Sequence, residues 1–201
     1  ERYTMLADVN RNVSKFEEIA LVHMDVIYGA ALKLTKSRME AEDLTQETFL
    51  RGYKFFDKFK EGTNCKAWLF KIMTNLFINK YNKAKSQPDM VNYDDIGDYY
   101  LTDKKSADDY IENPECLPEW IYDNLFDDDI RNALLELPEE FRIVIVLCDV
   151  QGFSYTDIAE MTGTKIGTVK SRLFRARQRL QQSLYEWGVN YGFIGAKIQH
   201  G

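Results

Sequence analysis

Residues 153–182 constrain the fold of this chain more than any other stretch, because they combine a helical apolar pattern with a break in its middle. Ala159 is small enough for two helices to approach closely, and Gly163, four residues later, can adopt the positive φ of a tight turn. After this glycine, apolar residues recur at steps of three and four, which predicts an amphipathic helix. They are Ile166, Val169, Leu173, Ala176, Leu180 and Leu184. The stretch therefore predicts a helix, a three-residue turn and a second helix.

The opposite face of the second predicted helix is strongly basic. It carries Lys165, Lys170, Arg172, Arg175, Arg177 and Arg179, and no acidic residue occurs between Glu160 and Glu186. A solvated helix normally mixes Glu with its Lys and Arg, because pairs four residues apart stabilise it. We therefore favour a face that binds duplex DNA, and the alternative is a merely solvated basic face.

Composition limits the class of protein. The chain has 201 residues, 45% of them hydrophobic, which suffices for one or two small helical domains. No stretch approaches the roughly 18 consecutive apolar residues of a membrane span, and no signal-peptide pattern is present, so we expect a cytoplasmic protein without membrane insertion. Cys65, Cys116 and Cys148 are scattered, and the two histidines lie far apart, so we expect no disulfide framework, no metal site and no cofactor.

The net charge of −6 is distributed unevenly along the chain. Residues 88–129 contain 14 acidic residues and only two lysines, whereas the rest of the chain holds 24 basic and 18 acidic residues. Three of the four prolines also fall in this acidic segment, which is typical of a linker. We therefore expect an all-α protein with helical domains at residues 13–87 and 130–187, an acidic, largely irregular linker between them, and a tail at residues 188–201.

Three polar residues of the first domain, Asp43, Gln46 and Glu47, share one face of a predicted helix because they lie at positions i, i+3 and i+4. Paired carboxylates can form a catalytic dyad, but no histidine, lysine nucleophile or metal set accompanies them. We therefore predict no enzymatic activity, and we interpret the face as a docking surface for a basic or amphipathic partner.

Residues 62–88 contain no acidic residue and combine lysines with aromatic residues. Basic side chains follow phosphates, and exposed aromatic or amide groups receive unstacked bases, so this composition predicts capture of single-stranded DNA. Aromatic residues on helices more often belong to a core, so we assign Trp68 and Phe77 to packing. Base recognition is then expected at the loop Gly62-Thr63-Asn64 together with Asn75.

Taken together, the two halves resemble the extracytoplasmic-function sigma factors, the two-domain initiation subunits of bacterial RNA polymerase. AEDLTQETFLRGYKFFDKF at residues 41–59 is similar to the polymerase-binding part of sigma domain two, and GTNCKAWLFKIMTN at residues 62–75 to its promoter-melting part. Residues 137–180, from LPEEFR to RQRL, are similar to sigma domain four. The resemblance covers nearly all of residues 15–187 and implies core RNA polymerase and promoter DNA as partners, with polymerase performing the chemistry.

The resemblance also implies three sets of contact residues. Contacts with core polymerase are implied for Asp43, Leu44, Gln46, Glu47, Phe49 and Arg51. Contacts with the minus-ten promoter element are implied for Lys60, Thr63, Asn64, Lys66, Trp68, Asn75, Asn79 and Lys80. Contacts with the minus-thirty-five element are implied for Lys165, Thr168, Lys170, Ser171, Arg172, Phe174, Arg175 and Arg179.

Within this family, the GTNCKAWLFKIMTN run, the LPEEFR start and Tyr191-Gly192-Phe193 are most similar to the sigma-R and sigma-H subgroup of thiol-oxidative stress regulators. That similarity implies a small zinc-containing anti-sigma factor as a third partner, with the zinc held by the partner. The recognition helix departs from the subgroup at Lys170 and at Phe174-Arg175-Ala176, where Met and His-Arg-Gly are more typical. The promoter sequence therefore does not follow from the resemblance.

Two other functions fit parts of the sequence. An ordinary helix-turn-helix regulator would need a ligand-binding or dimerisation domain in place of residues 15–85. A sigma-like decoy that sequesters an anti-sigma factor would not need a basic recognition face, yet this chain keeps one. We therefore favour a promoter-specific sigma factor that does not form a homo-oligomer.

Overall fold

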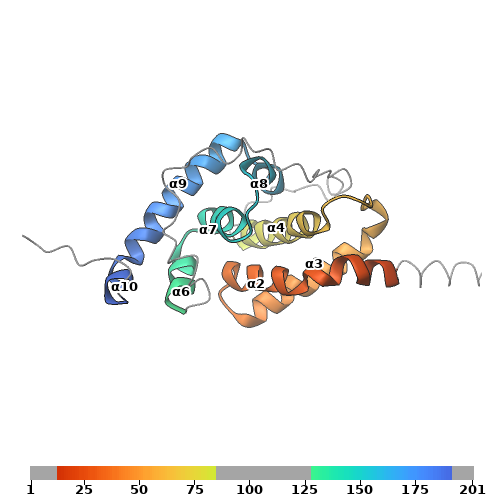
Figure 1. The fold of residues 1–201 in the computed structure, drawn as a ribbon, viewed down its shortest axis with the longest axis horizontal. Coiled ribbons are helices and arrows are strands. Elements are labelled where there is room, and N and C mark those ends of the chain that lie inside the picture. Colours follow the sequence, from red (N-terminus) through yellow and green to blue (C-terminus); the bar gives the residue numbers. More distant parts are fainter. Residues whose placement is uncertain (1–12, 85–127, 192–201) are drawn as a thin grey trace, which may run out of the picture. The chain divides into compact units, whose positions relative to one another are not determined.

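The computed structural model describes residues 13–84 and 128–191 (Figure 1), and these residues contain helices and connecting turns but no strand. Residues 13–84 belong to one compact unit and nearly all of residues 128–191 to another. The all-α prediction is therefore confirmed for the described residues. Most of the predicted acidic linker, residues 88–129, and the end of the predicted tail lie outside them, so the structure leaves both predictions as they stand.

The described part of the first unit, residues 13–84, starts with helical residues 13–20 and continues with five further elements. These are η1 (Leu21–His23), α2 (Met24–Leu34), α3 (Arg38–Lys54), η2 (Phe56–Lys58) and α4 (Cys65–Ala84). Helix α3 packs against both α2 and α4. A Cβ atom added to Gly52 on α3 would lie 3.2 Å from the Leu69 side chain and 3.4 Å from that of Phe16, so only glycine allows this close approach without a shift.

Local hydrogen bonds define where helices α3 and α4 of the first unit begin. At the start of α3 the Ser37 hydroxyl accepts a hydrogen bond from the Glu40 N–H at 3.2 Å, and the Glu40 carboxylate accepts one from the Lys36 N–H at 3.1 Å. At the start of α4 the Asn64 side-chain oxygen accepts from the Ala67 N–H at 3.0 Å. Each cap satisfies a backbone donor that has no partner inside its helix.

Six helical segments lie in the second stretch that the structure describes, residues 128–191. They are α6 (Asp128–Glu136), α7 (Glu139–Ile145), the π-helical η5 (Val146–Val150), α8 (Tyr155–Thr162), α9 (Ile166–Ser183) and α10 (Tyr185–Asn190). Gly163, between α8 and α9, has a φ of 63°, which confirms the predicted turn of the helix-turn-helix. Ser154 and Asp157 exchange two hydrogen bonds of 3.1 Å at the start of α8, in the manner of a capping box.

The apolar face predicted for α9 forms the inner side of this unit. Four of its residues, Val169, Leu173, Ala176 and Leu180, are at most 1% exposed, and Leu184, which follows the helix, is also buried. Ile166 differs, because it stands at the first position of the helix and is 43% exposed. The periodicity therefore identified the buried face correctly except at its N-terminal end.

Helix α10 closes the second unit at its C-terminal end. The Trp187 indole N–H donates a hydrogen bond of 2.9 Å to the Asp129 carboxylate on α6, and its ring stacks on Tyr191 with centroids 4.5 Å apart. Helix α10 is thereby attached to α6 of the same unit. None of the helices in the described ranges is both long enough and apolar enough to cross a membrane.

Candidate nucleic-acid interface

The outward face of α9 carries the side chains predicted to meet DNA. Lys165 is the N-cap residue, and Lys165, Lys170, Ser171 and Arg175 are exposed, while Phe174 is 43% exposed. Arg175 forms no hydrogen bond or ion pair with any residue that the structure describes. Its guanidinium is therefore available for a bidentate contact with a base or a phosphate.

Other polar side chains of α9 have partners on the protein. Arg172 donates a hydrogen bond of 2.8 Å to the Glu140 carboxylate on α7, and the Arg179 guanidinium lies 5.1 Å from the centre of the Phe141 ring. The Lys170 ammonium lies 5.9 Å from the centre of the Tyr155 ring on α8.

Thr168 and Ser171 complete the set of residues predicted for the minus-thirty-five (upstream) promoter element. Ser171 is exposed and Thr168 half-buried, and the Ser171 hydroxyl donates to the Thr168 carbonyl at 3.0 Å. Both residues therefore lie on α9 beside the cationic side chains.

Arg177 requires a correction, because it was expected on the basic face and the structure buries it. Its side chain and that of Asp149 are each 4% exposed, and the two form a bidentate pair with distances of 2.6 and 3.0 Å. Burial alone would lower the pKa of Arg177, but the hydrogen bonds and the charge of Asp149 outweigh burial and raise it. Because Arg177 follows Leu173 by four residues, it lies on the inner face of α9.

The loop at residues 60–64 is stabilised by contacts close in sequence. The Thr63 hydroxyl donates to the Lys60 carbonyl at 2.6 Å, and Asn64 caps α4 through its side-chain oxygen. Gly62 has a φ of 80°, a conformation that favours glycine. Lys15, in the first helical segment, forms an ion pair with Glu61. The loop therefore presents small polar groups on a fixed backbone.

The remaining residues predicted for the minus-ten (downstream) promoter element occupy different environments on α4. Asn75 and Asn79 are half-buried, and the half-buried Lys66 places its ammonium 5.7 Å from the centre of the Phe70 ring. Lys80, with a side chain 65% exposed, lies 3.9 Å from Glu40.

Trp68 is 2% exposed, and its ring centre lies 5.0 Å from that of Phe59. Of the two roles considered for Trp68, the structure supports packing, because the indole is not accessible to a base.

His23, at the end of η1, is partly buried and lies near the charge of Lys66 on α4. Burial of the imidazole and, to a smaller extent, the charge of Lys66 both lower the pKa of His23. Protonation of His23 would therefore place a second positive charge near Lys66 at the start of α4.

The face of α3 predicted to dock a partner differs in two residues from expectation. Asp43 and Gln46 are exposed, and Glu47 accepts a hydrogen bond of 2.6 Å from Arg51. Leu44 and Phe49, however, are only 9% and 8% exposed and belong to the core.

Two apolar residues that sequence reasoning missed lie on this outward face of α3. Met39 is 70% exposed and Leu50 is 63% exposed. Both share the helical spacing of Asp43 and Gln46, at steps of three and four residues. The outward face therefore combines acidic, amide and apolar groups.

No group of acidic, histidine and cysteine residues in the described ranges is arranged to hold a metal ion. Burial raises the pKa of the Cys65 thiol to about 11, so this thiol stays protonated and unreactive near neutral pH.

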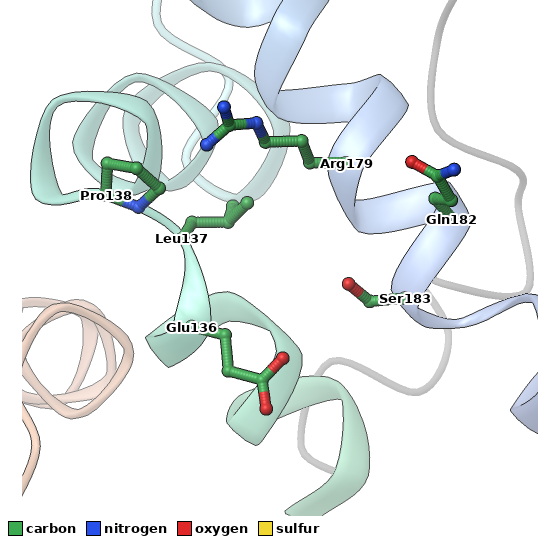
Figure 2. Close-up of a pocket in the computed structure, with 6 residues that line it drawn as sticks. All are labelled: Glu136, Leu137, Pro138, Arg179, Gln182 and Ser183. Atoms are coloured by element: carbon green, nitrogen blue, oxygen red, sulfur yellow. The ribbon is translucent and has the colours of Figure 1, made fainter.

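An open hollow of about 340 Å³ occurs in the second unit (Figure 2). Arg179 extends into it from α9 toward the turn between α6 and α7. It is lined by Glu136, Leu137, Pro138, Arg179, Gln182 and Ser183. These groups do not include a nucleophile activated by a neighbouring base, so the hollow has no catalytic arrangement.

Comparison with known proteins agrees with this description. Residues 21–87 match the family Sigma-70 region 2, and residues 127–180 match Sigma-70, region 4. The chain is 36% identical over 159 residues to the ECF RNA polymerase sigma factor EcfG of Rhodopseudomonas palustris, covering 79% of each chain. It is also 36% identical over 169 residues to SigE of Mycolicibacterium smegmatis, covering 84% of this chain and 61% of that protein.

Among solved structures, the sigma factor RpoE from Bartonella quintana, in complex with the anti-sigma factor NepR, has a TM-score of 0.60 and 31% sequence identity. The match covers 85% of this chain and 97% of the other. This chain therefore belongs to the extracytoplasmic-function sigma factors of RNA polymerase. It is an initiation factor that directs transcription from specific promoters.

Proposed function

We propose that this sigma factor reads the upstream promoter element as duplex DNA with α9 and holds unstacked bases of the downstream element at the loop before α4. The observation that carries the proposal is the outward face of α9, which is free of acidic residues and exposes Arg175 without a partner among the described residues. The N-terminal part of a recognition helix reaches base edges in the major groove. Lys170, Ser171, Phe174 and Arg175 occupy that part of α9.

At the downstream element, the loop at residues 60–64 supplies the short polar groups that hold a base removed from its stack. The Asn64 side-chain oxygen accepts the cap hydrogen bond, so the proposed contact with a base uses the amide N–H groups as donors. Holding a flipped base offsets an unstacking cost of a few kcal/mol. Lys60, Lys66 and Lys80 place positive charge along the strand, and Asn75 and Asn79 add amide groups.

The outward face of α3 is the proposed contact with core polymerase. Asp43, Gln46 and Glu47 provide polar groups there, and Met39 and Leu50 provide exposed apolar area. Exposed apolar groups beside polar groups are typical of a protein interface. Leu50→Asp is expected to weaken binding to core polymerase, whereas Val22→Asp, at a residue 70% exposed on η1, serves as the matched control.

Transcription in a purified system tests the proposal as a whole. Core polymerase is combined with this chain on a library of promoters in which the upstream and downstream elements vary independently, and run-off transcripts are sequenced. We expect strong enrichment at both elements and comigration of the chain with core polymerase. Tight binding to duplex promoter DNA by the chain alone, without any effect on polymerase, would instead identify an ordinary helix-turn-helix regulator.

We further propose that an anti-sigma factor restrains this protein in the bacterial cytoplasm and does so by covering the outward face of α3. The support is that the similar Bartonella sigma factor was solved in complex with the anti-sigma factor NepR. A factor that covers α3 blocks polymerase directly. Binding of the chain to core polymerase at saturating anti-sigma factor would contradict this arrangement.

The finer assignment, to the sigma-R and sigma-H subgroup, rests on the GTNCKAWLFKIMTN and LPEEFR motifs. It predicts that the anti-sigma factor binds zinc and releases the sigma factor when its cysteines are oxidised. Purification of the complex followed by metal analysis tests this prediction. A zinc-free anti-sigma factor would reject the subgroup and leave the sigma-factor assignment intact.

A further inference from the structure

Glu140 and Arg172 form an ion pair at the flank of the recognition helix. The Arg172 guanidinium nitrogen lies 2.8 Å from a Glu140 carboxylate oxygen, and the two residues are 32 positions apart in sequence. The Arg172 side chain is 24% exposed and that of Glu140 is 52% exposed. Arg179, seven residues after Arg172 and so on the same side of α9, rests over Phe141. The first turn of α7 therefore contacts two arginines along one flank of α9.

Neither stability nor DNA affinity accounts for a carboxylate at this position. An ion pair this exposed contributes little to folding stability. A carboxylate beside a helix that binds DNA also repels phosphates and cancels the charge of its arginine. What the pair does provide is a fixed orientation for a long, flexible side chain.

We propose that Glu140 is a positioning residue that sets the base preference of this sigma factor through Arg172. A guanidinium carries five N–H donors in a rigid fork, and the contact with Glu140 leaves others free for a base edge. Holding Arg172 in one orientation lowers the entropy lost when it meets a guanine, and it disfavours alternative contacts with phosphates. This inference rests on the proposed function of α9 and adds a specificity role for a residue outside that helix.

The test measures base preference with the complete holoenzyme. Open-complex formation is measured on promoters carrying each base at each upstream position, for wild type, Arg172→Ala, Glu140→Ala and the double variant. We expect Arg172→Ala to lose roughly tenfold discrimination at one position, as for loss of a bidentate base contact. Glu140→Ala should reduce discrimination at the same position, and the double variant should lose no more than Arg172→Ala.

Two charge-matched variants separate orientation from charge. Glu140→Gln keeps a side-chain oxygen that can accept the hydrogen bond, so it should retain most of the discrimination. Asp128→Asn removes an equal charge from the exposed start of α6 and should leave the base preference unchanged.

Three results would overturn the inference. The first is that Glu140→Ala increases activity equally on every promoter and leaves base preference unchanged, because the carboxylate would then act only by repelling phosphates. The second is that Arg172→Ala leaves the preference unchanged at every upstream position. The third is a wild-type holoenzyme without any upstream preference, which would reject the proposed function of α9 itself and this inference with it.

Discussion

The recognition helix α9 and the loop before α4 hold their polar side chains in opposite ways. On α9, Arg172 and Arg177 reach partners 32 and 28 residues away, on other helical segments. In the loop, Thr63 and Asn64 bond to backbone groups only three residues away. A long side chain on a rigid helix needs an outside partner to fix it, whereas a short side chain is fixed by the turn that carries it. Loss of the buried Arg177–Asp149 pair is therefore expected to destabilise the second unit more than substitutions in the loop destabilise the first unit.

The largest effect is expected at the buried pair in the second unit. Asp149→Ala leaves the Arg177 charge buried without its carboxylate and should lower the free energy of unfolding by about 3 to 5 kcal/mol. Urea denaturation of the full chain, followed by circular dichroism, measures the change.

The matched control replaces both members, as Asp149→Leu with Arg177→Met, and should restore most of the lost stability. If Asp149→Ala destabilises the chain no more than Glu140→Ala, the contrast between buried and exposed pairs is wrong.

Arg175, unlike Arg177, should contribute little to folding stability, because it has no partner among the described residues. Arg175→Ala is expected to leave folding stability within about 0.5 kcal/mol of wild type, as for most surface substitutions. It should nevertheless cost about 1 to 3 kcal/mol of discrimination at one upstream base pair. Transcription from the promoter library measures the discrimination.

Arg179→Ala is the comparison variant for Arg175→Ala. Arg179 lies farther along α9, so we assign it to a phosphate contact and expect its loss to weaken all promoters alike. Uniform loss for both variants would show that the division of roles along α9 is wrong.

Variants of Asn64 test whether the side chains of the loop at residues 60–64 are held by contacts close in sequence. Asn64→Ala removes the cap of α4 and should destabilise the chain by about 0.5 to 2 kcal/mol, whereas Asn64→Ser retains a capping oxygen and should restore stability. Both variants lack the amide and should form open complexes poorly on duplex promoters, with recovery on templates whose minus-ten region is already melted.

Normal open-complex formation by Asn64→Ser would assign this residue to capping alone. Equal defects of both variants on melted and duplex templates would exclude a role of the amide in strand opening.

The smallest effect is expected from His23. Its folded-state pKa is lowered, so the unfolded chain takes up the proton first, and the stability contribution of neutral His23 is present above the unfolded pKa of about 6.5. That contribution is lost as the pH falls toward the folded-state pKa. As the pH falls below about 6.5, the free energy of unfolding should therefore decline more steeply for wild type than for His23→Gln. Parallel profiles would show that His23 is not in the environment described.

The sequence predicted those features that depend on neighbouring residues. The buried face of α9 followed from apolar spacing, and the turn between α8 and α9 from Gly163. The capping role of Asn64 also had a local signal, an asparagine directly before a helix, but only its base-binding role was considered.

Arg177 shows where residue type misled the prediction. Its spacing from Leu173 pointed to the inner face, yet its charge suggested exposure. The partner that allows its burial, Asp149, is 28 residues away on a π-helical segment, and no local pattern announces such a pair.

On α3, Leu44 and Phe49 face the core and Leu50 faces outward, and helical spacing alone did not predict this division. Packing against α2 and α4 decides it, and that information is not local.

The hydrogen bond from Trp187 to Asp129 has a mechanical consequence for the second unit. It joins α10 to the second residue of α6, so these two helices are fastened to each other at the two ends of the described part of the unit. A displacement of the start of α6 is then shared with α10 and does not act on the recognition helix alone. The hydrogen bond therefore couples α6 and α10 directly, in addition to the contacts that each of them makes with α9.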